Sequence, residues 1–218
     1  MVEWRRTLIW SAELQPATVT SESADRTSTI KAQIERKEAS QSLSEEDHLR
    51  QLDVRITPTV ITDPSGRIFE RCFELINKTN QFNTTGRRWT LAEMIGFLKD
   101  GGVMISVEVE DRHASYGITG VAMVSGATVE QLVLSCRVFG MGVQQTMLAL
   151  CLQKIAAHHG EKVVAGRVLY TGKNRLAHDI FARVGMVKAE DGIWRGPPSG
   201  LSDIARAIPA HVTLASPA

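Results

Sequence analysis

The sequence predicts an α/β protein of the α+β kind, with a mixed, mostly antiparallel twisted sheet flanked by helices. Strand-like runs at residues 103–111, 118–124 and 127–138 are joined by glycine-containing turns, which is typical of antiparallel neighbours. A glycine turn then leads into a helical pattern whose apolar face contains Val143, Met147 and Cys151 and which ends at His159-Gly160. We take this succession of strand, turn and helix as the centre of the fold.

Composition excludes several classes of function. The chain has 218 residues, of which 43% are hydrophobic, and its 25 Lys and Arg residues against 24 Asp and Glu leave a net charge of +1. That balance gives no general attraction to nucleic acid or to an anionic membrane. The cysteines have neither zinc-ligand spacing nor the pattern of a disulfide framework, so we expect no metal. With no evident signal peptide or membrane span, we expect a cytoplasmic protein with reduced thiols.

The composition changes along the chain and predicts three parts. Residues 1–65 are polar and charged, and we expect a short helical segment there, with one helix around Ile30 and Ile34 and a second from Ser44 through Leu52. Residues 66–196 form the compact domain. Residues 197–218 are an Ala-, Ser- and Pro-rich tail in which we identify no chemistry.

The remaining elements of the compact domain follow from apolar spacing and from capping residues. Ile68, Cys72, Phe73 and Ile76 recur at helical spacing. The sequence from Thr90 to Glu93 fits a capping box, which opens a helix that ends at Gly101-Gly102. We further expect a strand over 162–170, a helix over 174–184 with Leu176, Ile180 and Phe181 facing inward, and a last strand over 186–194.

The pattern Arg137-x-x-Gly140-x-Gly142 lies between an apolar strand and the long helix. Free backbone N–H groups at a helix N-terminus, together with the helix dipole, favour an anion such as pyrophosphate. Glycines after a strand also serve ordinary tight turns, so this signal alone is weak. Cys136, directly before the pattern, is either a small buried strand residue or a nucleophile.

A second motif, Asn174-x-x-Ala177-x-x-x-Phe181, follows the Arg137–Gly142 pattern along the chain and precedes Gly185-Met186. It makes the first pattern more specific. The two motifs, in this order, resemble those of the acyl-CoA-dependent N-acetyltransferase superfamily, the GNAT fold. The resemblance covers residues 67–196 and implies that Asn174 lies near the thiol of a bound pantetheine. It also implies that the glycine turn holds the phosphate of phosphopantetheine or CoA through these residues: Arg137, Val138, Gly140, Met141, Gly142 and Val143.

Four further segments match one family within that superfamily in order and spacing: residues 78–90, 111–113, 117–122 and 134–143. They resemble the FkbH-like glyceryl transferase/phosphatase family, whose members load polyketide assembly lines. The resemblance implies an acyl thioester or acyl phosphate donor and an acyl carrier protein as partner. The Asp-x-Asp motif of that family's phosphatase half does not occur in this chain, and residues 1–65 resemble only the last helices of that half. We therefore expect a piece of a longer protein or a member without the phosphatase.

The resemblance assigns Cys136 as the nucleophile, since a helix N-terminus and Arg137 favour the thiolate form. Cys72 and Cys151, on apolar helix faces, are predicted to be core residues. His113 is the candidate base, with Asp111 to orient it, although a histidine in a loop is as often simply solvated. Asn80 and Asn83 are expected to hold the acyl group or an oxyanion, and the alternative for both is capping and turn formation.

Together these observations predict an acyltransferase of polyketide or nonribosomal peptide biosynthesis. A small acyl group would pass through a thioester on Cys136 to the phosphopantetheine thiol of an acyl carrier protein. One alternative is an N-acyltransferase that moves an acyl group from CoA or a carrier to an amine without a covalent intermediate. The other is a module that docks a carrier protein without catalysis.

Overall fold

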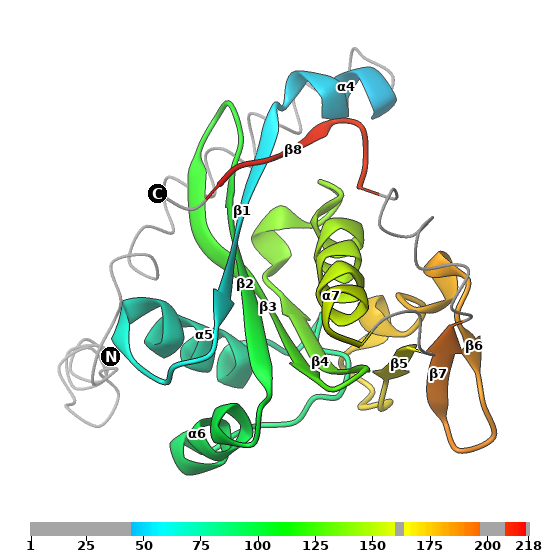
Figure 1. Ribbon diagram of the computed structural model, residues 1–218. Helices are drawn as coiled ribbons and strands as arrows, with labels where there is room; N and C mark the ends of the chain where they lie inside the picture. Colours follow the sequence, from blue (N-terminus) through cyan, green and yellow to red (C-terminus); the bar gives the residue numbers. More distant parts are fainter. Residues whose placement is uncertain (1–44, 160–163, 197–207, 217–218) are drawn as a thin grey trace, which may run out of the picture.

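The computed structural model describes residues 45–159, 164–196 and 208–216. Its elements form an eight-stranded mixed sheet with helices on both faces (Figure 1). In chain order they are α4 Glu45–Gln51, β1 Val54–Ile61, α5 Gly66–Lys78, α6 Leu91–Lys99, β2 Val103–Glu110, β3 Ser115–Ser125, β4 Thr128–Leu134, η2 Cys136–Val138, α7 Val143–His159, β5 Val164–Arg167, η3 Arg175–Ala177, η4 Ala182–Val184, β6 Val187–Lys188, β7 Ile193–Gly196 and β8 Val212–Leu214, where η marks a short 3-10 helix.

The strand order in the sheet is β6-β7-β5-β4-β3-β2-β1-β8. Strands β1 to β4 form a continuous antiparallel block, whereas β4–β5 and β1–β8 are parallel pairs. The predicted α+β class, with a mixed and mostly antiparallel sheet between helices, is therefore confirmed. Among the described residues, no helix combines the length and the apolar character needed to cross a membrane.

The sheet separates two hydrophobic clusters, because side chains along a strand alternate between its faces. On one face α7 packs against β3 through Met147, over the bare backbone of Gly120. On the other face α5 and α6 cover the sheet, and Met94 of α6 is fully buried beside Val121 and Met123 of β3 (Figure 1). The helix stripes predicted from apolar spacing thus face the sheet, except that Ile68 is 41% exposed.

Two expected helix starts are present. Helix α6 begins with the predicted capping box: the Thr90 hydroxyl accepts from the Glu93 N–H, and the Glu93 carboxylate accepts from the Thr90 N–H. Helix α4 occupies the place expected for the second helix of the N-terminal segment, whereas the helix expected around Ile30 lies outside the described residues.

Both ends of the described chain add strands where none was expected. Residues 54–61, assigned to a helical segment, form β1 and pair with β2, with Val54 and Ile56 fully buried. In the expected tail, β8 pairs in parallel with β1, Val54 opposite Val212. The sequence could not indicate a strand of three residues such as β8, because such a short strand forms only where it pairs with a sheet edge far away in the sequence.

The region after β5 also differs from expectation. Residues 174–184 form the two 3-10 turns η3 and η4 instead of one helix, and Leu176, expected inside, is 52% exposed. The expected last strand is a hairpin of β6 and β7, turned at Gly192, whose φ of 79° suits glycine. Ile180 and Phe181 are buried as predicted.

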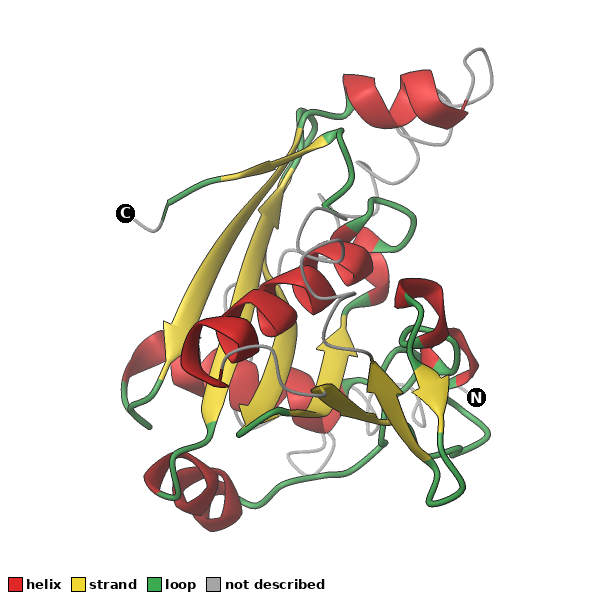
Figure 2. Ribbon diagram, turned by 45° about the vertical axis from the view of Figure 1, so that its right-hand side comes forward, coloured by secondary structure: helices red, strands yellow, loops and turns green. Residues whose placement is uncertain are grey.

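Strands β4 and β5 diverge after only two paired positions, Thr128 with Ala165 and Val129 with Gly166 (Figure 2). Residues 82–84, which we call the inserted segment, fill the gap. Leu134 N–H donates to Phe82 O and Thr84 N–H donates to Leu132 O, both at 3.0 Å. Leu169 N–H, just after β5, donates to Thr84 O at 2.8 Å. The inserted segment therefore completes the hydrogen bonding of β4 where β5 has turned away.

Candidate functional site

Cys136 lies at the carboxyl end of β4, but not on the strand itself. The strand ends at Leu134, and Ser135 N–H donates to Thr119 O of β3 at 2.7 Å. Ser135 then caps the 3-10 turn η2, which begins with Cys136. The Cys136 side chain is exposed, whereas Cys72 and Cys151 are buried. Of the two readings open at the sequence level, a core strand residue and an accessible thiol, the geometry agrees with the second.

The buried cysteines match the prediction that they belong to the core. Burial raises the pKa of the Cys151 thiol from 9.0 to about 12. A thiol with so high a pKa has almost no thiolate at neutral pH, and the thiolate is the nucleophile. Cys136 is therefore the accessible thiol among the cysteines of this chain.

The glycine turn after Cys136 has the backbone geometry that its sequence predicted. Gly140 and Gly142 have φ of 80° and 79°, in the left-handed region that favours glycine. Helix α7 starts directly afterwards at Val143, so the first N–H groups of that helix lack intrahelical acceptors. The Arg137 Nε donates to the Ser135 hydroxyl at 3.2 Å, while the side chains of Val138, Met141 and Val143 are buried in the core.

The C-terminal segment packs on one side of this turn. A Cβ on Gly142 would lie 2.9 Å from Pro209 Cγ and 3.0 Å from His211 Nε2. His211 Nε2 also lies 3.1 Å from the Met141 carbonyl oxygen, within hydrogen-bond distance. The turn therefore presents Gly140 to solvent while Gly142 is covered, and only glycine fits at position 142.

A pocket of about 170 Å³ opens beside the exposed part of the turn. Its lining residues come from the inserted segment, the turn, the first turn of α7 and the region of η3 and η4: Phe82, Phe139, Gly140, Gln144, Leu176, Asp179, Ile180 and Arg183. The Phe82 and Phe139 rings lie 6.0 Å apart and make one side of it apolar. Arg183 and Asp179 form an ion pair at 2.8 Å. Of the predicted anion-binding residues, Gly140 lines this pocket, and Cys136 is not among its lining residues.

Gln144 is the polar group of the pocket that the protein itself does not satisfy. Its side-chain oxygen is buried and has no hydrogen-bond partner among the described residues. An unsatisfied buried acceptor costs about 1–3 kcal/mol, so such groups in native proteins call for an explanation. A ligand that donates an amide N–H in this pocket would supply the missing partner. The Oε1 of the neighbouring Gln145 is likewise buried without a partner among the described residues, but Gln145 does not line the pocket, and nothing in the sequence distinguishes the two.

Asn83 is fully buried and its side chain is occupied by the fold. Its Oδ1 accepts from Gly86 N–H and from Gln131 Nε2, both at 2.8 Å, and from Thr85 N–H at 3.3 Å. Its Nδ2 donates to Thr79 O at 3.3 Å. The turn-forming alternative for Asn83 is thus the one that the geometry supports, and acyl positioning by this side chain is not.

Asn174 has a similar position on the other side of the inserted segment and is also fully buried. Its Nδ2 donates to the Asn83 and Leu169 carbonyl oxygens, both at 2.8 Å. Its Oδ1 accepts from Thr171 N–H at 3.1 Å and lies 2.9 Å from His178 Nε2. The side chain that was expected near a pantetheine thiol therefore ties the loop after β5 to the inserted segment.

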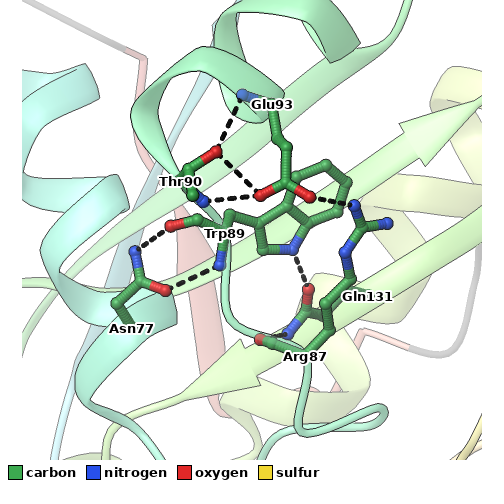
Figure 3. Close-up of polar contacts among 6 residues, drawn as sticks. All are labelled: Asn77, Arg87, Trp89, Thr90, Glu93 and Gln131. Carbon is green, nitrogen blue, oxygen red and sulfur yellow. Dashed lines mark hydrogen bonds and ion pairs between the residues drawn. The ribbon is translucent and has the colours of Figure 1, made fainter.

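A polar network anchors the chain between α5 and α6 on β4 (Figure 3). The Trp89 indole N–H donates to Gln131 Oε1 at 2.6 Å, and Gln131 Nε2 donates to the Arg87 carbonyl at 3.0 Å. Asn77 and Trp89 exchange two hydrogen bonds, of 2.9 and 3.0 Å. The Arg87 guanidinium lies 3.6 Å from the Trp89 ring centroid and pairs with Glu93. Since Gln131 also binds Asn83, this network holds the inserted segment in place.

Asp111 and His113 lie in the hairpin between β2 and β3, because β2 ends at Glu110 and β3 begins at Ser115. Asp111 Oδ1 accepts from the His113 and Ala114 N–H groups at 2.8 and 2.9 Å, and its Oδ2 accepts from the Tyr116 hydroxyl at 2.9 Å. This is the pattern of a turn-forming aspartate. Asn80 is exposed at the surface, where it accepts from the Arg88 guanidinium.

Comparison with models of protein families gives no match for this chain, and comparison with curated proteins gives no similar protein. No group of three or more His, Cys, Asp or Glu side chains that could hold a metal ion occurs within the described ranges. The arrangement of the molecule itself therefore carries the functional assignment. Its elements are an exposed thiol, a glycine turn at the start of a helix, and an adjoining pocket with one unsatisfied polar group.

Proposed function

We propose that this chain is an acyltransferase of the GNAT fold, similar to the FkbH-like family, that works on phosphopantetheine thioesters in polyketide or nonribosomal peptide biosynthesis. The observation that carries the proposal is the exposed Cys136, one 3-10 turn before the loop of Phe139 and Gly140 that lines the pocket. The antiparallel β2–β3–β4 block, the glycine turn before α7 and the parallel β5 support the fold assignment.

The lining of the pocket is complementary to a phosphopantetheine arm, which joins a phosphate to amide groups and a thiol. Apolar walls of Phe82, Phe139 and Ile180 would cover its methylene groups, and Gln144 would accept from one of its amide N–H groups. The N–H groups at the start of α7 would hold its phosphate. CoA carries the same arm, so a CoA thioester would fit the same pocket.

In the proposed reaction the Cys136 thiolate attacks the acyl carbonyl carbon of the donor. A C–S bond forms, the donor thiolate or phosphate leaves, and an acyl-S-enzyme results. The pantetheine thiolate then attacks the same carbon and releases Cys136. Exchange between two thiols changes the free energy little, so the protein contributes mainly proximity and orientation. His113 is proposed to take the proton, and this role stays a prediction.

Intact-protein mass spectrometry tests the nucleophile. Wild type, Cys136→Ala and the matched control Cys72→Ala are each incubated with acetyl-, malonyl- and glyceryl-thioester donors. We expect wild type and Cys72→Ala to gain one acyl mass and Cys136→Ala to gain none. Equal labelling of wild type and Cys136→Ala would contradict the proposal.

One observation favours a second candidate, direct transfer from an acyl thioester to an amine. Cys136 is not among the residues that line the pocket, so a thioester bound there could meet an amine without passing through that thiol. This reaction predicts that Cys136→Ala retains most of its turnover with an amine acceptor. A steady-state assay that follows release of free CoA distinguishes the two candidates.

A further inference from the structure

The region between β5 and β6 concentrates charge and exposed apolar area on one part of a nearly neutral chain. Residues 167–188 contain five basic residues, Arg167, Lys173, Arg175, Arg183 and Lys188, against the single acid Asp179, whereas the whole chain has a net charge of +1. The rest of the chain is therefore net negative. The excess of basic over acidic residues is therefore confined to one region of the chain.

The same region holds several of the exposed large apolar side chains of the described residues. Of the eight large apolar side chains found exposed among the described residues, four lie here: Leu169, Tyr170, Leu176 and Val187. Leu169 is 59% and Tyr170 is 65% exposed. Isolated exposed apolar residues are ordinary, whereas several of them in one region beside charges without an ion-pair partner are typical of interaction sites.

The charges of this region differ in their pairing. Arg167 pairs with Glu130 at 2.7 Å, and Arg183 pairs with Asp179. Within the described ranges no carboxylate lies at ion-pair distance from Lys173, Arg175 or Lys188. These three cations are therefore available to the carboxylates of a partner.

The surface is held in a defined shape. The Tyr170 ring lies 3.8 Å from the His178 ring, and Lys188 Nζ lies 5.2 Å from the Tyr170 ring centroid. Below them Asn174 binds Thr171 N–H and the Leu169 carbonyl, which fixes the loop that carries Lys173 and Arg175. A preformed surface loses little conformational entropy when a partner binds.

The geometry points to this surface, formed by Leu169, Tyr170, Lys173, Arg175, Leu176 and Lys188, as the docking site of an acidic protein that carries the phosphopantetheine arm. Leu176 belongs both to the surface and to the pocket, so a partner seated here would have the pocket at its edge. Charge complementarity favours a surface of carboxylates with apolar residues between them. This inference rests on the proposed function and adds to it the place where the partner binds.

Alkylation of Cys136 measures docking without requiring turnover. The probe is a bromoacetyl group on the phosphopantetheine arm of a strongly acidic acyl carrier protein of fatty-acid synthesis, compared with the same bromoacetylated arm free in solution. The Cys136 sulfur forms a bond to the methylene carbon, bromide leaves, and the proton passes to buffer. The ratio of carrier-bound to free rate isolates the contribution of the protein surface.

We compare Lys173→Glu/Arg175→Glu with a matched charge reversal on α5 and α6, Arg67→Glu/Lys99→Glu. Reversing two charges turns two attractions to the carrier into repulsions, so we expect the first variant to lower the carrier-bound rate roughly fivefold. The free-arm rate and the control variant should stay at wild-type values. Raising the salt concentration should slow the wild-type reaction with the carrier and leave the first variant almost unchanged.

Four outcomes would overturn the inference. A carrier-bound arm that reacts no faster than the free arm, or that is insensitive to Lys173→Glu/Arg175→Glu, rejects this docking surface alone. A free arm that alkylates Cys136 no faster than it alkylates glutathione rejects the proposed function as well. Charge-dependent binding to phosphatidylserine vesicles without any effect on the carrier would assign the surface to a membrane instead.

Discussion

Replacing Asn83 by alanine tests whether this residue supports the fold or the reaction. The substitution removes the acceptor of Gly86 N–H and of Gln131 Nε2, both at 2.8 Å, and the weaker acceptor of Thr85 N–H. It also removes the Nδ2 donor that binds Thr79 O. Gln131 Nε2 retains the Arg87 carbonyl at 3.0 Å, whereas the Gly86 N–H loses its acceptor. The inserted segment would then be held mainly by its backbone hydrogen bonds to β4.

The magnitude follows from these contacts. Two short hydrogen bonds contribute about 1 kcal/mol each, and a partly buried donor left without an acceptor costs about 1–2 kcal/mol more. We therefore expect Asn83→Ala to lower the free energy of unfolding by about 3–4 kcal/mol, a large fraction of the stability of a domain of this size. Asn80→Ala is the matched control, since Asn80 is exposed and binds only at the surface. It should change stability by less than about 0.5 kcal/mol.

Urea unfolding followed by circular dichroism measures both variants. Equal slopes with a lower midpoint for Asn83→Ala would indicate a loss of native-state stability. A loss below about 1 kcal/mol, combined with a severe defect in acyl transfer, would refute the structural role and restore Asn83 as an acyl-positioning residue.

Three further predictions concern thiols, pH and packing. Iodoacetamide should label Cys136 in the native protein and label Cys72 and Cys151 only after unfolding, as measured by peptide mass spectrometry. Labelling of Cys151 in the native protein at the same rate as Cys136 would contradict the burial argument. Burial raises the pKa of Glu74, but hydrogen bonds from Lys78 and Arg71 outweigh it and lower that pKa from 4.5 to about 2. Because the folded pKa lies below the unfolded one, this stabilisation is present above pH 4.5 and is lost as the pH falls towards 2. It amounts to about 3 kcal/mol, and Glu74→Gln should flatten that part of the stability curve. Gly166→Ala should lower the melting temperature by costing about 1–3 kcal/mol, since a Cβ there overlaps the buried Phe181 ring, whereas Gly96→Ala on α6, with no atom near its Cβ position, should not.

Local sequence signals located most elements of the compact domain. The Thr90–Glu93 capping box starts α6, and the glycine turn at 140–142 starts α7. Such signals succeed because they act between residues that are near one another in the chain. The same reasoning placed Cys72 and Cys151 in the core, since a helix with an apolar stripe turns that stripe to the sheet.

Elements whose formation depends on partners far away in the chain could not be predicted from the sequence. The strands β1 and β8 exist because each finds a sheet edge far away in the sequence. Residues 174–184 have a helical apolar pattern, yet they form two separate 3-10 turns. Asn174, directly before the first turn, binds the inserted segment about ninety residues earlier. Here the tertiary hydrogen bonds prevailed over local propensity.

The amino-acid sequence was enough to predict the α+β class, the central antiparallel strands and the glycine turn before α7. It left Cys136 open between a core residue and a nucleophile, and only the family resemblance favoured the nucleophile. The surroundings of these features became apparent in the folded molecule. In the folded protein Cys136 is exposed, whereas Asn83 and Asn174 are fully buried and hydrogen-bonded. Pro209 packs against Gly142, and Gln144, whose side-chain oxygen has no partner among the described residues, lines the pocket. The physical reason is that exposure and hydrogen-bond partners are properties of the packed chain, set by residues that no local pattern brings together.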